Sequence, residues 1–420
     1  MRTHPNARLV VPALRLPAED LDPLLRLAAR GVGGFCVFGG DLSSLRAILE
    51  RLQAEAPHPL LFASDVEDGA GQQVKGLTRH PPAAALDPDA AEAAGVRTAV
   101  EARLMGLTMA FAPVCDVLST ARNPIIQARA FRHPPAPPRF VRGARAFGLR
   151  TCAKHFPGHG ATSLDSHDAL PVVDADLATW RKRDLPPFQA CIDAGVDAVM
   201  TAHVACPALT GSPTLPATLS RAVMTDLLRK EMGFSGLAVT DALLMEGVRG
   251  GRSEGEAALL SLEAGCDALL VPGDVEAVLA AVERAVAPEA LARMAAAADP
   301  LPDPLAAAAE ASVACAGDVR VGPGPHAPQV LDLDRRGAGE ALARAIGGLS
   351  VPSVLILRSD RAWGGALALP AEAREAVARA PLVILLGPPV LLDGLAPRAC
   401  VQAPGHDPLT VAAVARRVRG

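Results

Sequence analysis

The chain has 420 residues, of which half are hydrophobic and a fifth are charged, and its formal net charge is −4 at pH 7. The apolar residues are numerous enough to form a sizeable core, and the negative net charge provides no basic surface for binding nucleic acid. The N-terminal stretch has no continuous apolar run, and no later apolar run reaches the length of a membrane span. We therefore expect a globular, cytoplasmic protein whose partners include neither nucleic acid nor a membrane.

Short apolar runs that end in small or polar residues recur along the first two thirds of the chain. They alternate with stretches of helical spacing, such as AAEAAGVRTAVEARLMG and SEGEAALLSLEAG. Eight such alternations predict an α/β fold, a (β/α)8 TIM-type barrel. The predicted strands are ARLVVPAL from Ala7, GGFCVFGG from Gly33, PLLFASD from Pro59, LTMAFAPVCD from Leu107, LRTCAKHF from Leu149, VDAVMTAH from Val196, GLAVTDAL from Gly236 and CDALLVPG from Cys266.

We place the barrel at residues 1–300. Alanine-rich stretches broken by DPLPDP predict a helical segment and linker over 301–348. Residues 349–420 contain the strand-like runs SVLILRSD and PLVILLGPP, the helix-like PAEAREAVARA and a last helix near LTVAAVARRV. They predict a small C-terminal α/β domain. This region has no nucleotide-binding glycine pattern, so we expect it to have a packing or supporting role.

Polar residues follow the predicted strands at the ends where barrel enzymes place their chemistry. A single aspartate after a strand is commonly a capping or turn residue. Here, however, residues from five strands point to one mouth of the barrel. They are Asp65, Asp116, Lys154 with His155, His203 and Asp241.

The segment TCAKHFPGHGATSLDSHDALP, residues 151–171, supports either a metal site or acid–base chemistry. On a helix, His155 and His159 would share one face and suit a zinc ion, with His167 as a third ligand. Pro157 and the glycines beside it exclude that helix, although histidines on loops can also bind metal. Alternatively, Asp165 orients the imidazole of His167 and keeps it usable as a proton donor. We favour the second hypothesis and expect no metal and no cofactor.

Five blocks resemble the signature blocks of family 3 glycoside hydrolases, in the β-N-acetylhexosaminidase branch. They are AKHFPGHGATSLDSHDALP, FAPVCDV, NPIIQARAF, VMTAHV and VTDALLMEGV. The resemblance implies a retaining mechanism in which Asp241 forms a glycosyl-enzyme and His167, paired with Asp165, is the acid/base. It also implies substrate contacts from Asp65, Arg129, Lys154 and His155.

The resemblance further implies an exo-acting β-N-acetylglucosaminidase that removes terminal sugars from cell-wall fragments, as in peptidoglycan recycling. A β-glucosidase or xylosidase of the same family stays open, although those enzymes typically take a glutamate acid/base from a later domain. Phosphorolysis also stays open, because a histidine repels an anionic acceptor less than a carboxylate does. A metal-dependent barrel hydrolase and a catalytically silent binding protein are the alternatives from other classes.

The chain departs from the family pattern directly after Asp65. The usual Gln-Glu-Gly-Gly-Arg run is replaced by VEDGAG, residues 66–71, so the basic group often found there is missing. The chain also contains no tyrosine and few other aromatic residues on which sugars could stack. We therefore expect altered distal sugar contacts and a shallow site for a single terminal sugar.

Overall fold

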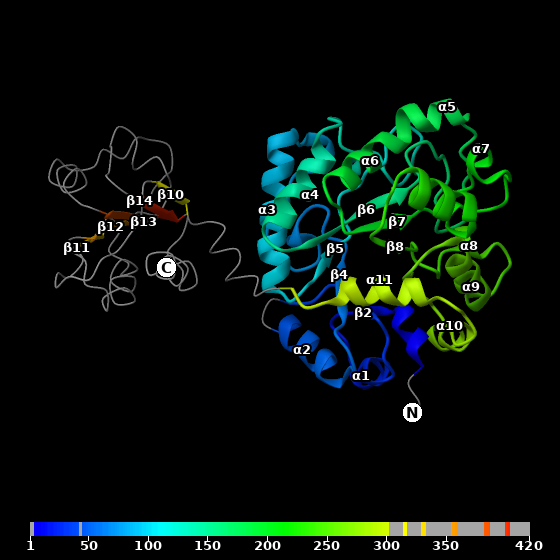
Figure 1. Cartoon of the computed structure of the whole chain (residues 1–420), viewed down its shortest axis with the longest axis horizontal. Coiled ribbons are helices and arrows are strands. Elements are labelled where there is room, and N and C mark those ends of the chain that lie inside the picture. The colour runs from blue at the N-terminus through cyan, green and yellow to red at the C-terminus, as the bar shows by residue number, and fades with distance from the viewer. Residues whose placement is uncertain are drawn as a thin grey trace. The chain divides into compact units, whose positions relative to one another are not determined.

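The computed structural model describes residues 4–41 and 44–301, together with five strand segments beyond them. The chain divides into two units, residues 1–301 and residues 302–420. Figure 1 labels most of the helices and strands of both units. In the part of the chain that the structure describes, each helix is too short or too polar to span a bilayer.

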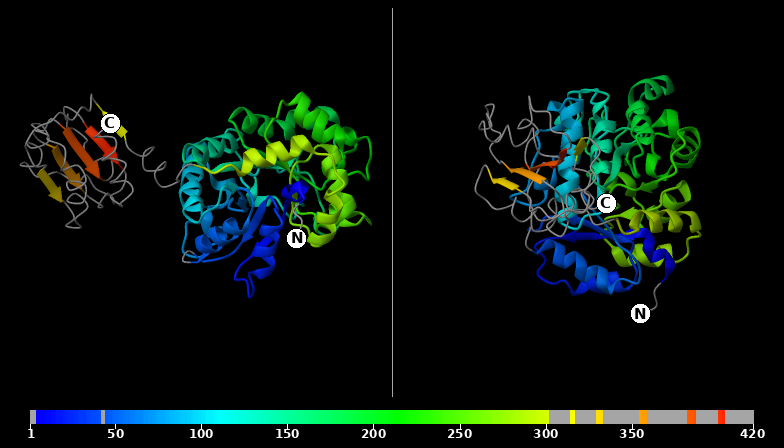
Figure 2. Two further views of the ribbon diagram at one scale, coloured as in Figure 1. Left: turned by 60° about the horizontal axis from the view of Figure 1, so that its bottom comes forward. Right: turned by 60° about the vertical axis from the view of Figure 1, so that its left-hand side comes forward.

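The first unit is a ring of parallel strands with helices around its outside (Figure 1, Figure 2). Strands β2 to β8 form one continuous sheet. Only Pro12 separates β1 from β2, and β1 pairs with β9, which meets β8 through the bridge between Val239 and Ala268. The ring therefore closes, and the predicted (β/α)8 barrel is confirmed. Its strands are β1 (Val10–Val11), β2 (Ala13–Arg15), β3 (Gly34–Phe38), β4 (Leu61–Ser64), β5 (Met109–Ala110), β6 (Arg150–Phe156), β7 (Ala198–Thr201), β8 (Leu237–Val239) and β9 (Leu269–Leu270).

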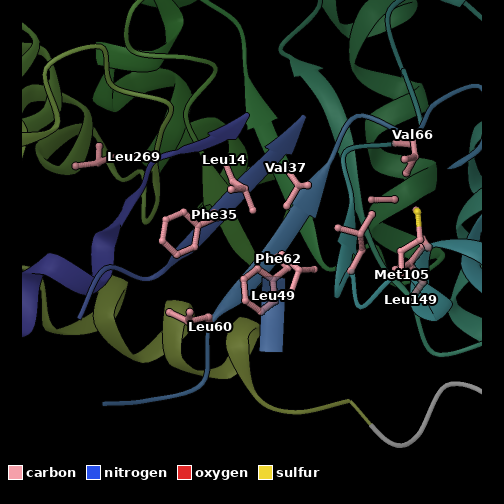
Figure 3. Packing of buried hydrophobic residues seen from close by; sticks show 14 of the residues in the cluster. Leu14, Phe35, Val37, Leu49, Leu60, Phe62, Val66, Met105, Leu149 and Leu269 are labelled. Atoms are coloured by element: carbon pink, nitrogen blue, oxygen red, sulfur yellow. The ribbon is translucent and has the colours of Figure 1, made fainter. Parts of the chain in front are cut away.

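Alternation of side chains along each strand divides the apolar residues between two cores. In β3, Phe35 and Val37 belong to the cluster beneath the outer helices, whereas Cys36 belongs to the cluster inside the ring. In β4, Phe62 lies in the outer cluster and stacks on Phe35 with ring centroids 6.4 Å apart. Figure 3 shows this outer packing, to which α2 contributes Leu49. The two cores hold the ring rigid enough to position side chains at its mouth.

Several helices of the barrel begin at side chains that accept hydrogen bonds from the free N–H groups of the first turn. In α3, the side chain of Asp87 accepts the N–H of Ala90 and caps the first turn. In α9, Ser253 and Glu256 form a reciprocal capping box. The helices are α1 (Asp22–Ala29), α2 (Leu45–Glu55), α3 (Pro88–Leu104), α4 (Ala136–Ala146), α5 (Leu177–Thr179), α6 (Leu185–Asp193), α7 (Pro207–Thr210), α8 (Glu246–Arg249), α9 (Glu254–Ala264), α10 (Val275–Val282) and α11 (Pro288–Ala298), with π-helical turns η5 (Trp180–Asp184) and η7 (Ala222–Glu231) and 3-10 turns η1 (Pro5–Leu9), η2 (Ala70–Gln72), η3 (Ala83–Ala85), η4 (Gln127–Arg129) and η6 (Ala217–Leu219).

Helix α11 lies across the N-terminal ends of the strands, opposite the mouth. Its Arg293 pairs with Asp267, which precedes β9 and is fully buried. Asp267 also pairs with Arg229 at 2.5 Å. Arg150, at the start of β6, donates to the carbonyl oxygen of Asp299 beyond the end of α11. Charged groups at this end of the barrel therefore bind one another and hold α11 in place.

The second unit contains a five-stranded sheet in the order β10-β14-β13-β12-β11. Strand β10 is antiparallel to β14, and the other neighbours are parallel. Its strands are β10 (Ala314–Ala316), β11 (Gln329–Asp332), β12 (Val354–Arg358), β13 (Leu382–Leu386) and β14 (Cys400–Ala403). The expected strands SVLILRSD and PLVILLGPP contain β12 and β13. The helices expected within 302–348 and 349–420 lie outside the described residues.

Candidate active site

A cavity of about 280 Å³ opens at the C-terminal ends of the strands. Six of the seven predicted site residues line it, and the seventh, Asp165, is hydrogen-bonded to one of them. The structure therefore brings the predicted residues together. The six are Asp65, Arg129, Lys154, His155, His167 and Asp241.

Lys154 lies at the centre of a charged cluster on one side of the cavity. Its Nζ is 2.6 Å from Asp65 Oδ1 and 2.5 Å from Glu67 Oε1, and its side chain is 2% exposed. Arg129 binds both oxygens of Glu67, with Nε and Nη2 at 2.9 and 2.7 Å. Burial lowers the pKa of Lys154, but the two carboxylates outweigh it and hold the pKa above its usual range. Lys154 is thus charged, and the cluster presents fixed donors and acceptors to a polar ligand.

Asp116 organises the backbone around this cluster rather than facing the cavity. Its Oδ2 accepts from His155 N at 3.1 Å and from His155 Nδ1 at 2.7 Å, while Oδ1 accepts from His159 N at 2.5 Å. With Nδ1 donating, His155 Nε2 is left as an acceptor, and Arg129 Nη2 lies 3.4 Å from it. Burial raises the pKa of Asp116, but His155 and His159 outweigh it and lower the pKa. Asp116 therefore fixes the ring and tautomer of His155.

His167 and Asp165 form the predicted pair on the loop that follows β6. His167 Nδ1 donates to Asp165 Oδ1 at 2.6 Å, and His167 N donates to the same oxygen at 2.8 Å. This arrangement leaves Nε2 as the ring nitrogen that can exchange a proton with a ligand. The side chain of His167 is 61% exposed and reaches the cavity from its open side.

The loop carrying this pair is anchored through Ser166. Ser166 is buried, its Oγ is 3.0 Å from His159 Nε2, and its carbonyl oxygen accepts from Gly247 N in α8 at 3.0 Å. The carbonyl oxygen of His167 accepts from Glu246 N at 3.3 Å. A Cβ on Gly247 would lie 2.8 Å from Ser166 O, so only glycine lets the loop approach this closely. His159 thus holds the loop through Ser166, and the contacts with α8 hold His167 over the mouth.

Asp241 follows β8 and lines the cavity. Its Oδ1 accepts from Ala242 N at 2.8 Å. Burial raises the pKa of Asp241, but His155, His203, the Ala242 N–H and Lys154 outweigh it and lower the pKa. His203 is itself buried and binds Thr218 and the carbonyl oxygen of Ala242, and burial lowers its pKa. The carboxylate of Asp241 is therefore ionised and available to act as a nucleophile.

The segment after Asp241 is held by an unusual backbone conformation at the end of β9. Val271 has a φ of +46°, in the left-handed region that β-branched residues avoid. The consecutive carbonyl oxygens of Leu270 and Val271 accept from the consecutive amides of Leu243 and Leu244, at 2.8 and 3.4 Å. The side chain of Val271 lines the cavity. Backbone strain of this kind is often found at functional sites.

Glu67 and Gln73 line the cavity, and sequence reasoning missed both. Glu67 binds Lys154 and Arg129, whose combined effect lowers its pKa although burial opposes it. Gln73 accepts from Gly39 N and donates to the carbonyl oxygen of Asp65, joining two loops at the mouth. A signal for Glu67 existed, because it is the acidic residue that the chain keeps from the usual Gln-Glu-Gly-Gly-Arg run.

The three histidines of residues 151–171 do not converge on one point. Each has its own partner, Asp116 for His155, Ser166 for His159 and Asp165 for His167. Within the described ranges, there is no group of three His, Cys, Asp or Glu side chains placed to hold a metal ion. The geometry therefore offers each imidazole for hydrogen bonding or proton transfer.

Most of the first unit matches a known family. Residues 25–298, more than half of the chain, match the model of the glycosyl hydrolase family 3 N terminal domain. The chain belongs to glycosyl hydrolase family 3. It is accordingly a glycoside hydrolase, and its substrates are carbohydrates.

Relatives of this family 3 chain carry related names. A beta-hexosaminidase of Chromobacterium violaceum is 36% identical over 292 residues, covering 64% of this chain and 80% of that protein. One from Neisseria meningitidis serogroup C is 35% identical over 278 residues, covering 62% and 76%. A solved family 3 beta-N-acetylglucosaminidase from Paenibacillus sp. str. FPU-7 is 26% identical with a TM-score of 0.67, covering 99% of this chain and 95% of that one.

Proposed function

We propose that this family 3 protein is a retaining exo-β-N-acetylglucosaminidase in which Asp241 is the nucleophile and His167, paired with Asp165, is the acid/base. The observation that carries the proposal is that Asp241 and His167 line the same cavity. The names of the relatives support the choice of sugar. The natural substrate we propose is a cell-wall-derived or related glycoside in peptidoglycan recycling, within the cytoplasm.

In the first step, the Asp241 carboxylate attacks the anomeric carbon while His167 Nε2 gives its proton to the glycosidic oxygen. The bond to the leaving group breaks, and a covalent glycosyl-enzyme forms. Asp165 stabilises the imidazolium that supplies the proton. In the second step, neutral His167 takes a proton from water, the water attacks the anomeric carbon, and Asp241 is released. Two inversions return the sugar with its original β configuration.

Sugar recognition falls to the charged cluster on the far side of the cavity. Asp65, which is 33% exposed at its side chain, is the carboxylate best placed to accept bonds from sugar hydroxyls. Lys154, Arg129 and His155 supply the neighbouring donors and acceptors. A wrong sugar would leave these buried groups without partners, which gives the site its selectivity. Glu67 stands between the two cations and keeps both in position.

All of these residues lie in the first unit. We therefore assign catalysis to the barrel, residues 1–300. The cavity of about 280 Å³ falls below the volumes typical of sites for drug-sized ligands, roughly 300–1,000 Å³, and suits a single sugar ring. This supports removal of one terminal sugar at a time. The region 349–420, beyond a linker over 301–348, has a supporting role in this proposal.

The test compares an aryl β-N-acetylglucosaminide with the matching aryl β-glucoside. We expect kcat/KM to favour the first by about 10²-fold or more. Asp241→Asn should lower kcat by about 10⁴-fold or more. His167→Ala should lower it by about 10²–10⁴-fold for a poor leaving group, and far less for a dinitrophenyl leaving group, which needs no proton.

Two control variants carry the same chemical changes on the exposed surface. Asp226→Asn in η7 and His133→Ala should each retain wild-type kcat and KM, since both residues lie outside the cavity lining. Proton NMR of the first product should show the β anomer. Preference for the β-glucoside, release of the α anomer, or wild-type activity in Asp241→Asn would each contradict the proposal. Equal activity after treatment with a chelator would separate it from a metal-dependent hydrolase.

A further inference from the structure

The leaving group of a substrate lies outside the sugar cavity. This inference rests on the proposed function. His167 protonates the glycosidic oxygen, so the leaving group begins where the cavity meets His167. The side chain of His167 is 61% exposed, and the cavity behind it suits one sugar ring. The surface next to His167 therefore determines which leaving groups the enzyme accepts.

Three exposed leucines lie on the segments that follow β5, β6 and β8 at the mouth of the barrel, and we call them the rim leucines. Leu164 is 54% exposed and directly precedes Asp165. Leu118 is 42% exposed, two residues after Asp116, and Leu244 is 38% exposed, three residues after Asp241. Each rim leucine is thus carried by a segment that also carries a residue of the site.

Hydrogen bonds join these three segments to one another. Ser119, next to Leu118, donates its N–H to Gly160 O at the start of the His167 loop. At the other end of that loop, His167 O accepts from the N–H of Glu246, which lies two residues after Leu244. Leu244 N also donates to the carbonyl oxygen of Val271, whose side chain lines the cavity. The rim leucines are therefore carried by segments that are bonded to one another at the mouth of the barrel, outside the residues that line the cavity itself.

The distribution of exposed apolar side chains favours this opening. Among the described residues, seven large hydrophobic side chains are exposed. Besides the rim leucines, Val172 and Leu177 follow the His167 loop in the same connection between β6 and α6. Only Leu260 in α9 and Val286 lie elsewhere. A single exposed leucine is ordinary on a protein surface, but the concentration of five of the seven on the connections at the mouth of the barrel favours a binding surface there.

We propose that the rim leucines form a leaving-group site that takes glycosides whose aglycone presents an alkyl or aromatic surface next to the linkage. The terminal sugar enters the polar cavity, and the aglycone covers Leu118, Leu164 and Leu244 as it binds. Apolar contact at this position contributes affinity without any hydrogen bond to the aglycone, so the site accepts aglycones of varied polar structure provided that one face is apolar.

The experiment compares methyl and hexyl β-N-acetylglucosaminides. Both leaving groups are primary alkanols of similar basicity, so the chemical step treats them alike and a difference in kcat/KM reports contact with the alkyl chain. Each methylene fully removed from water is worth about fourfold in affinity. With the added chain about half covered, we expect wild-type kcat/KM for the hexyl glycoside to exceed that for the methyl glycoside about tenfold to thirtyfold.

Leu164→Ser should reduce the hexyl-to-methyl ratio at least threefold. Leu118→Ser, on a neighbouring loop, should do the same and provides an independent variant should the first disturb the His167 loop. Leu260→Ser is the matched control, because Leu260 is 36% exposed on α9, away from the cavity, and its ratio should stay at the wild-type value.

The outcomes separate this inference from the function on which it rests. Hydrolysis of an aryl β-N-acetylglucosaminide with equal kcat/KM for the methyl and hexyl glycosides overturns the leaving-group site and leaves the proposed function intact. A wild-type ratio in both Leu164→Ser and Leu118→Ser also overturns the site. Hydrolysis of none of the N-acetylglucosaminides overturns the proposed function and this inference together.

Discussion

Val271 adopts a left-handed backbone conformation, with φ at +46°, although its side chain is β-branched. Such a conformation costs a residue with a Cβ about 1–2 kcal/mol relative to glycine. Alanine at this position keeps that cost, and glycine removes it. Glycine also loses one buried methyl group, about 0.8 kcal/mol. Glycine also makes the unfolded chain more flexible, which lowers the free energy of unfolding by a further 0.5–1 kcal/mol or so. The opposing contributions nearly cancel, so Val271→Gly and Val271→Ala should have free energies of unfolding within about 1 kcal/mol of each other.

Val278 is the matched control, because it is fully buried and lies within helix α10. Glycine has no strain to relieve there, so Val278→Gly should be about 1.5–2 kcal/mol less stable than Val278→Ala. At each position we take the free energy of unfolding of the glycine variant minus that of the alanine variant. Subtracting one of these differences from the other cancels the contributions of the methyl group and of the unfolded chain. The remainder, about 1–2 kcal/mol, is the strain at Val271.

The assay is equilibrium unfolding in urea, followed by the fluorescence of Trp180, which is buried in the first unit. All four variants carry Trp363→Phe, so that Trp180 is the single reporter. Since Val271 lines the cavity, both of its variants should also raise KM several-fold, whereas the Val278 variants should not. Glycine-minus-alanine differences of equal size at the two positions would refute the reasoning.

Three further predictions concern charged and titratable groups. Burial lowers the pKa of His203, so its contribution to stability is complete above the unfolded value of about 6.5 and is lost as the pH falls. His203→Asn should therefore reduce the fall in unfolding free energy between pH 6.5 and 5 by up to about 1.4 kcal/mol per pH unit, and an unchanged slope in urea titrations would contradict this. Glu67→Gln should lower kcat/KM about 10- to 100-fold, because two cations in the cavity lose their shared partner, whereas the exposed control Glu50→Gln should stay within twofold of wild type. Asp267→Asn should lower the free energy of unfolding by about 3–5 kcal/mol, because Arg229 and Arg293 lose the negative charge that they share. The kcat per folded molecule should not change, and a fall in kcat would show that Asp267 takes part in the chemistry.

The sequence predicted the barrel well because alternating apolar runs are a local signal. Each of the eight runs contains a strand, including β5 and β9, which are only two residues long. It also placed Asp65, Lys154 and Asp241 at one mouth, because the carboxyl ends of parallel strands in a closed ring meet there. These predictions required only the order of elements and the closure of the ring.

Features that depend on contacts between distant segments could not be predicted in this way. The docking of Ser166 on Gly247 is a main-chain contact between the loop after β6 and helix α8, and neither segment carries a local sequence signal for the other. Val271 stands in an ordinary strand sequence, LLVPGD, with no glycine at the left-handed position. The role of Glu67 depends on Lys154 and Arg129, which are distant in the sequence and which Glu67 contacts only in the folded chain.

The pairing of Val10 with Leu269 in β1 and β9 has a consequence for how the chain is made. A ribosome adding about 5–20 residues per second needs on the order of ten seconds to a minute to travel from the first partner to the second. During that interval the nascent ring has two unpaired edges, one at β1 and one at the last strand made, which is finally β8, and both are open to other chains. Association of chaperones with the nascent chain should therefore end once the segment that contains β9 has left the ribosome.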